Sequence, residues 1–437
     1  MSEMHKEKVR RKKTAKRSVH NESIGYFIIP FRINPRRYKD FKKHIEYLSV
    51  NGKASDKNRF EKCRYLFSSI TDIYKNADYF QIDNEKLKSS MENGSDMWDK
   101  ILPLKALNSK ARYDAEVEEI SALIPDKSKG YLLFKVNYLD MKLTQIESFT
   151  YFFRHIANST RNNSSFARIA CYLLGIEDYE NFEQRKNDMT QPFCYLSSTT
   201  GYICDVLQLV CRKITDKREE HLACLGRGYQ NVGATANNYT NNSNYDIEFS
   251  SNKFSIWVGS PNTLTCVLEE DNDFTSHVQA NIENDYLCLY LTLQNQRHTL
   301  LTYMEDMVNN RNKPHELIKI YQSLNKFKIA ESFKTVSNEY AFQNIYEHMY
   351  KILDIDKLME DINDVSANAA EQKSKKIESV FGVFAIVSAI ETFYNLFTTS
   401  ACTGFQSKLR IFSIILSAAV IVFAVARIYL PGIFRKK

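Results

Sequence analysis

Two long apolar runs near the C-terminus form the clearest hydrophobic pattern in the chain. Residues 377–397 and 411–430 each approach the roughly 20 residues that an α-helix needs to cross a bilayer. They predict transmembrane helices 1 and 2, joined by a short external loop at residues 398–410. Lysines and arginines flank the pair on both outer sides, so the positive-inside rule places both termini in the cytoplasm. We therefore expect a multi-pass protein of the inner (cytoplasmic) membrane with a basic tail at residues 431–437.

The pattern upstream of these spans predicts a cytoplasmic α/β ligand-sensing domain at residues 21–285. Apolar runs at 26–33 and 130–137 indicate buried strands, and three short strand-like segments (245–249, 254–258, 264–268) follow later, the last two separated by the turn Gly259–Asn262. Helical periodicity is expected at 40–83 with a break at Asn51–Gly52, at 143–158 and at 200–225.

Residues 286–376 have a different character and predict a helical stalk. Between Tyr286 and Lys376 there is no glycine, and the one proline, Pro314, suits the first turn of a helix. Because no breaker separates this stretch from the first span, we expect one rod from Pro314 to Phe397, longer than roughly 100 Å. Such a rod needs neighbours, which favours a bundle of several subunits.

Charge and cysteine content refine this picture. Much of the net charge of +7 lies in residues 1–20, where eight Lys or Arg accompany two Glu. This block predicts a basic disordered tail on anionic lipid headgroups, with nucleic-acid contact as the alternative. The nine cysteines are scattered and indicate reduced cytosolic thiols. A zinc site at Cys204, Cys211, His221 and Cys224 is the alternative to buried core thiols.

A polar stripe on the first span predicts that this helix lines a pore. Ser388, Glu391 and Asn395 are spaced three and four residues apart. An acid inside a membrane helix is costly unless it faces water or a partner. The same helical face continues back through three apolar residues that suit a dewetting gate, namely Phe384, Phe381 and Ile377. In the alternative, Glu391 lies near the outer interface and reaches water there.

The order of these elements resembles the CorA-type divalent-cation transporters. Sequence similarity is confined to about residues 360–437, where Asn368, Lys376-Ile377 and Phe381 match the pre-membrane pattern and Tyr394 and Asn395 match two positions of the Tyr-Gly-Met-Asn motif. The Gly and Met of that motif and the usual Met-Pro-Glu loop are absent. The chain therefore most resembles the CorA-like membrane effectors of type III CRISPR systems. The implied fold class is an α+β cytoplasmic domain, a long stalk helix and a C-terminal two-helix transmembrane hairpin in a CorA-like homopentamer.

This resemblance implies a membrane ion channel that a nucleotide second messenger, SAM-AMP, opens in antiviral defence. Two alternatives stay open: a divergent Mg²⁺ or other divalent-cation transporter, and a membrane-tethered signalling or adaptor protein. No H-E-x-x-H, G-x-S-x-G or Walker lysine motif is present, so we expect no enzyme and no required cofactor. The expected partners are further copies of the chain, the lipid bilayer and a small nucleotide, with no stable nucleic-acid partner.

Two groups of residues are candidates for binding a ligand or a metal. Aromatic rings can stack on a base and arginines can grip phosphate, which suggests a nucleotide site at Phe152, Phe153, Arg154, His155, Arg161 and Arg168. The alternative is an amphipathic helix with its phenylalanines in the core and Arg154 solvated. Carboxylates on the lower stalk suit Mg²⁺ between subunits, with a solvated helix face as the alternative; they are Asp354, Asp356, Asp361 and Asp364.

Overall fold

The computed structural model describes most of the chain between residues 23 and 365. The described ranges are 23–55, 58–90, 115–154, 165–175, 193–196, 204–227, 248–251, 255–270 and 272–365, with the single residues 367, 382 and 388. They fall into two compact units. Unit 1 draws on Met1–Thr302 and Glu331–Leu358, and unit 2 on Tyr303–Ala330 and Met359–Lys437. The chain therefore leaves unit 1, returns to it, and leaves it again.

A mixed β-sheet forms the centre of unit 1. Its nine described strands are β1 (Ile24–Ile33), β2 (Asp78–Gln81), β3 (Glu116–Asp126), β4 (Lys129–Asn137), β5 (Cys194–Leu196), β6 (Asp205–Cys211), β7 (Glu248–Ser251), β8 (Ser255–Ser260) and β9 (Thr263–Leu268). The order is β2-β3-β4-β1-β6-β9-β8-β7, and β5 also pairs with β1. Of the described pairings, β6 with β9 is parallel and the others are antiparallel.

Strand β1 occupies the middle of this sheet because nearly all of its side chains are apolar and buried. It contains Pro30, which has no backbone N–H to donate. On the side away from β4, strand β6 pairs with Ile24–Ile28 and β5 pairs with Phe31–Ile33. Pro30 therefore lies between the two paired stretches, where no described neighbouring strand on that side requires a backbone N–H from β1.

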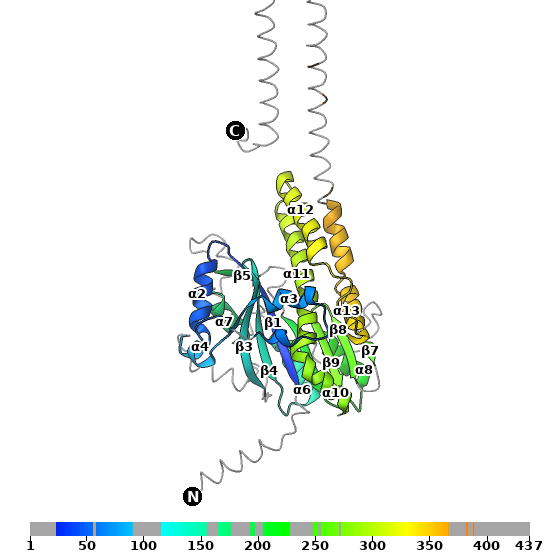
Figure 1. Ribbon diagram of the computed structural model, residues 1–437. Helices are drawn as coiled ribbons and strands as arrows, with labels where there is room; N and C mark the ends of the chain where they lie inside the picture. Colours follow the sequence, from blue (N-terminus) through cyan, green and yellow to red (C-terminus); the bar gives the residue numbers. More distant parts are fainter. Residues whose placement is uncertain are drawn as a thin grey trace, which may run out of the picture. The chain divides into compact units, whose positions relative to one another are not determined.

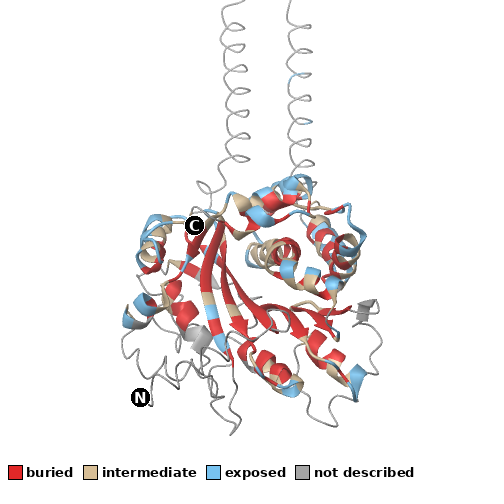
Figure 2. Ribbon diagram, turned by 60° about the horizontal axis from the view of Figure 1, so that its bottom comes forward, coloured by how far each residue is buried: buried red, intermediate tan, exposed pale blue. Residues whose placement is uncertain are grey.

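Helices cover both faces of the sheet (Figures 1 and 2). The principal apolar core lies on one face, where it includes side chains from α2 (Tyr38–Leu48), α4 (Asn84–Ser90), α6 (Leu143–Arg154), α7 (Ser165–Leu173) and α8 (Arg218–Arg227). Alternate strand residues face the other way. They meet the 3-10 helix η2 (Arg59–Lys62), α3 (Ser68–Lys75), the π-helix η4 (Ile282–Tyr286), the first part of α11 (Leu287–Asn309) and α13 (Tyr340–Ile352). Helix α10 (Asp273–Asn281) leads directly into η4.

The described part of unit 2 is helical. It comprises the end of α11, helix α12 (Pro314–Ala330) and residues 359–365. Tyr303 and Phe327 make an edge-to-face contact with ring centroids 6.4 Å apart. Lys328 Nζ donates to Asn363 Oδ1 at 3.3 Å. The start of α12 at Pro314 confirms the position predicted for a new helix.

The unbroken stalk rod predicted from Pro314 is wrong. After α12 ends, residues 331–339 are not helical, and α13 begins at Tyr340. Ser337 explains part of the break, because its hydroxyl donates to Tyr65 O at 2.5 Å and accepts from Glu339 N at 3.0 Å. Serine side chains that bond nearby backbone groups compete with helix formation. A second break follows at Asp354, whose φ is 54°.

The predicted fold class is therefore corrected. The α+β body is present, but no helix among the described residues is long and apolar enough to cross a membrane. The longest described helix, α11, has 23 residues and carries Gln294, Asn295, Gln296, Arg297 and His298 in succession. The predicted membrane and ion-channel features are corrected by the same finding, while the two predicted spans, apart from residues 382 and 388, lie outside the described ranges.

Several local predictions are confirmed, and one is reversed. The predicted strands at 26–33 and 130–137 correspond to β1 and β4, and the helix from Leu143 corresponds to α6. The three short strand-like segments correspond to β7, β8 and β9. The helix predicted over 200–225 is wrong, because its described part contains strand β6 and only the start of α8.

Candidate functional site

The π-helix η4 joins α10 to α11 and faces several other elements of unit 1. π-Helical turns are rare and occur frequently at functional sites. Three of its five residues reach different neighbours. Glu283 Oε1 lies 2.7 Å from Lys135 Nζ on β4. Asp285 and Tyr286 contact segments that lie far away in the sequence, so this one turn links parts of the chain that no local pattern connects.

Asp285 is fully buried and acts as an acceptor for backbone groups. Its Oδ1 receives hydrogen bonds from the N–H groups of Arg64 and Tyr65, each at 2.9 Å. These two residues follow η2 and precede α3. Within the described structure, Asp285 Oδ2 has no hydrogen-bond partner. Burying a carboxylate oxygen without a hydrogen-bond donor costs free energy. Asp285 is therefore a candidate functional residue.

Tyr286 belongs to a run of aromatic rings that extends from the sheet to α13. Its ring lies 4.8 Å from Trp257 of β8 and stacks on Phe342 of α13 at 4.5 Å. Phe342 in turn stacks on Tyr65 at 5.3 Å, and Tyr65 meets His277 of α10 edge-on at 5.4 Å. Aromatic pairs of this kind add about 0.5–1.5 kcal/mol each beyond their burial. These rings connect α13 to Tyr65, whose backbone N–H also donates to Asp285.

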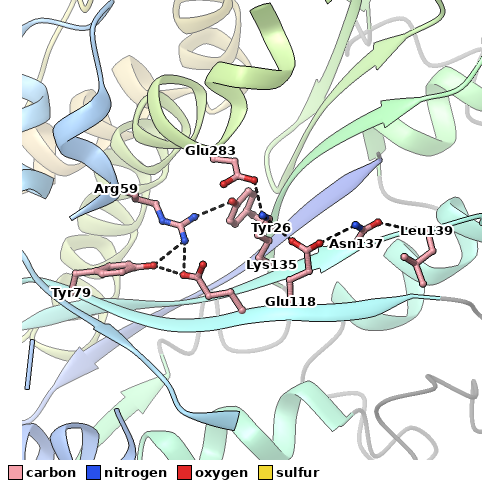
Figure 3. Close-up of polar contacts among 9 residues, drawn as sticks. Tyr26, Arg59, Tyr79, Glu118, Lys135, Asn137, Leu139 and Glu283 are labelled. Carbon is pink, nitrogen blue, oxygen red and sulfur yellow. Dashed lines mark hydrogen bonds and ion pairs between the residues drawn. The ribbon is translucent and has the colours of Figure 1, made fainter. Parts of the chain in front are cut away.

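A network of charged and phenolic groups lies beside η4 (Figure 3). Arg59 donates to the hydroxyls of Tyr26 and Tyr79, both at 2.9 Å, and to Glu119 Oε1 at 2.5 Å. The Tyr79 hydroxyl also donates to Glu119. Burial raises the pKa of Tyr79 to about 12, against the lowering effect of Arg59. Tyr79 is therefore a neutral donor at physiological pH.

Lys135, the register partner of Glu119, joins β3 to η4 beside this network. Its Nζ lies 2.8 Å from Glu118 on β3 and 2.7 Å from Glu283 on η4 (Figure 3). Burial tends to lower the pKa of Lys135, but the two carboxylates outweigh burial and raise it. Asn137 donates to Glu118 at 2.9 Å and accepts from Leu139 N at 2.9 Å. Hydrogen bonds and ion pairs therefore link Asn137 at the end of β4 through Glu118 of β3 and Lys135 to the π-helix.

Two histidine–carboxylate pairs lie elsewhere in unit 1. His221 Nδ1 of α8 is 2.6 Å from Glu147 Oε1 of α6. His298 Nε2 of α11 is 2.6 Å from Asp205 Oδ2 at the start of β6, whose other oxygen accepts from Asn262 at 2.9 Å. Both carboxylate side chains are fully buried. Neither pair had been singled out as a site from the sequence, because the partners are 74 and 93 positions apart.

The residues predicted to bind a nucleotide lie mostly in the interior or outside the described ranges. Phe153 packs in the core and stacks on Phe149 at 4.3 Å. Arg154 is buried rather than solvated, and its guanidinium donates to Arg227 O at 2.7 Å, at the C-terminus of α8. The structure describes Phe152 and Arg168 only as helical residues, and His155 and Arg161 lie outside the described ranges. Their binding role stays a prediction.

Most of the predicted pore residues lie outside the described ranges, and the predicted metal ligands are divided between units 1 and 2. Of the pore-lining candidates, Ser388 is described only as an exposed helical residue; Asn395, Glu391, Phe384, Phe381 and Ile377 lie outside the described residues. Asp354 pairs with Lys357 at 3.8 Å, and Asp356 accepts from Tyr350 at 2.8 Å. Asp361 and Asp364 belong to unit 2. Among the described residues no cluster of three or more His, Cys, Asp or Glu suits a metal ion, including the alternative zinc set. The site between subunits stays a prediction.

Comparison with known proteins adds no relative: no protein-family model, curated protein or solved structure matches the chain. The resemblance to CorA-type transporters accordingly stays a prediction based on the C-terminal residues.

Proposed function

We propose that the protein is a nucleotide-responsive regulatory protein, with unit 1 as the receptor and residues 331–358 as the part that responds. The observation that carries this proposal is the π-helix η4, whose Glu283, Asp285 and Tyr286 contact β4, the segment after η2, and α13. The proposed ligand class, a nucleotide second messenger such as SAM-AMP, is the one implied by the resemblance of the sequence to the CorA-like effectors of type III CRISPR systems.

The connections of residues 331–358 support a transmitting role for this segment. Phe67 N donates to Val336 O at 2.9 Å, and Ser337 bonds Tyr65 O, so the segment is fastened to the stretch that Asp285 also holds. Packed interfaces switch between discrete arrangements rather than deforming smoothly. A ligand that shifts η4 therefore changes the contacts of α13, after which the chain continues into unit 2.

The proposal assigns the protein no catalytic step. In both histidine–carboxylate pairs the carboxylate is fully buried and the histidine is mostly covered, with exposed fractions of 14% and 11%. In the network of Figure 3, Arg59 and Lys135 are each engaged by carboxylates. These groups hold elements together, which is the role that a receptor requires of them.

Calorimetric titration of the full-length protein with SAM-AMP, ATP and AMP tests the receptor role. We expect one of these nucleotides to bind, and hydrogen exchange in residues 331–358 to change when it does. Failure of all three to bind would exclude the nucleotide receptor and favour the adaptor alternative. Binding without any change of exchange in residues 331–358 would exclude the transmitting role.

Phe342→Leu separates binding from transmission. The leucine keeps an apolar side chain but loses ring stacking on Tyr65 and Tyr286. We expect unchanged nucleotide affinity and a smaller exchange response in residues 331–358. Phe80→Leu is the matched control, because Phe80 is equally buried but belongs to the principal core on the other face of the sheet. An equal response in both variants would contradict the assignment to the aromatic run.

A further inference from the structure

Helix α2 presents a basic and aromatic stripe on its outer face. Its buried residues are Phe41, Ile45 and Leu48, which pack on the core. Lys39, Lys43 and Tyr47 follow one another at four-residue spacing on the opposite face and are all exposed, Tyr47 at 67%. Residues 32–47 contain six Lys or Arg and two acids. The helix is therefore amphipathic, and cations outnumber the two acids, Asp40 and Glu46, on its polar side.

Neighbouring segments extend this positive surface at the N-terminal end of α2. Arg36 is exposed in the turn directly before the helix. The turn between β3 and β4 lies close by, because Lys127 Nζ sits 5.9 Å from the centre of the Tyr38 ring. On the sheet, Arg32 of β1 is the register partner of Lys129 on β4. Lys129 is itself paired with Asp126 at 3.9 Å and with Glu331 at 3.1 Å, so the positive surface at this end of α2 depends on Arg36 and Lys127.

Few acids offset these cations. Asp40 pairs with Arg37 at 2.8 Å and Asp78 pairs with Lys42 at 2.8 Å. In the described part of the chain, none of the remaining exposed cations of this surface forms an ion pair; they are Arg36, Lys39, Lys43 and Lys127. Unpaired cations on a convex helix suit an extended polyanion, because a small ligand needs a concave site.

We propose that α2 binds single-stranded nucleic acid, with Arg36, Lys39 and Lys43 on successive phosphates and Tyr47 stacked on a base. Phosphate contacts from Lys and Arg supply sequence-independent affinity. Exposed aromatic rings beside such cations hold unstacked bases. A duplex offers no free base to Tyr47, so the aromatic residue at the end of the stripe favours a single strand. This interaction is separate from the nucleotide response proposed above.

Fluorescence anisotropy with a labelled oligothymidylate and the full-length protein tests this inference. The variant Arg36→Gln/Lys39→Gln/Lys43→Gln keeps every buried residue of α2, and circular dichroism verifies its fold. We expect its Kd to rise at least tenfold at low salt. The slope of log Kd against log salt should fall by about 2, because each single-strand phosphate contact contributes about 0.7. Tyr47→Ala should weaken binding at least fivefold, as about 1–3 kcal/mol of stacking implies.

The control Lys62→Gln/Lys334→Gln/Lys351→Gln removes three exposed cations from other parts of unit 1. It separates the effect of α2 from that of net charge, and the basic residues 1–20 are present in every variant. An affinity loss equal to that of the α2 variant would overturn the proposal. So would wild-type protein that fails to bind at about 50 mM salt, or duplex bound more tightly than the single strand with no effect of Tyr47→Ala.

Discussion

Glu147 is an acid whose ionisation is linked to the stability of unit 1. Its side chain is fully buried in α6, and Oε1 lies 2.6 Å from His221 Nδ1. Burial raises the pKa of Glu147 to about 7, although the hydrogen bond and charge of His221 act to lower it. The ordinary value for glutamate is about 4.3. Between these two pH values the folded protein holds a proton that the unfolded chain has already released.

The sign of the resulting pH dependence follows from this proton count. Stability falls wherever the folded state binds more protons, so Glu147 should destabilise unit 1 progressively from about pH 4.5 to pH 7. The contribution approaches about 4 kcal/mol above that window. Urea unfolding of Glu147→Gln should therefore show a flatter profile between pH 5 and pH 8 than the wild type. Glu219→Gln, an exposed change on the helix that carries His221, should leave the profile unchanged; an unaltered profile in Glu147→Gln would contradict the assignment.

At the scale of elements, the π-helix η4 depends on Asp285 for its contact with the segment after η2. Asp285→Ala removes the acceptor of two N–H groups, those of Arg64 and Tyr65. An unpartnered buried donor costs about 1–3 kcal/mol; because Arg64 is exposed and Tyr65 half-buried, we expect a total loss of about 1–3 kcal/mol in the free energy of unfolding.

Asp285→Asn is the matched comparison, because the amide keeps an oxygen in the position of Oδ1 while removing the charge. Its stability should lie much closer to that of the wild type in urea unfolding. Equal destabilisation by alanine and asparagine would mean that the negative charge, rather than the two hydrogen bonds, stabilises the turn.

Sequence reasoning succeeded where a pattern is local. The turn Gly259–Asn262 between two apolar runs is enough to define the β8–β9 hairpin. It failed at β6, because a strand buried on both faces has no alternation and reads equally well as a helix. Strand β3 shows no clear strand pattern, because Glu116, Glu118 and Glu119 interrupt its apolar residues. The break at Ser337 depends on a partner, Tyr65, that lies 272 positions away.

The candidate site lay beyond what the sequence could reveal. Arg59 and Glu119 are 60 positions apart, and no motif relates either of them to Glu283. Only the sheet register and the placement of η4 bring the network together. At Arg154 the sequence offered a ligand contact or a solvated charge, whereas the structure buries this residue and places its guanidinium against the C-terminus of α8. Burial of an arginine against a backbone carbonyl has no signature in composition or spacing.

At the scale of the whole molecule, unit 1 is built from two separate stretches of chain. Residues 331–358 return to it after α12, and several of their apolar side chains are as buried as those of the sheet. Phe342, Ile345, Tyr346 and Met349 all lie within the fold. The Tyr346 hydroxyl also bonds Gln296 of α11, where both side chains are buried. The returning stretch is therefore part of the folded unit rather than an extension from it.

This discontinuity predicts how the chain tolerates shortening. A chain that ends at Ala330 loses the four buried side chains of α13, each contributing about 1.5–3 kcal/mol. Their sum is comparable to the whole stability of a typical domain, about 5–15 kcal/mol. The shortened chain also removes Phe342 from Tyr286 and Tyr346 from Gln296. We expect it to lack a cooperative thermal transition, whereas a chain that ends at Val365 should keep one. If both chains melted at the same temperature, α13 would be a peripheral helix, and its proposed role in transmitting ligand binding would fail with it.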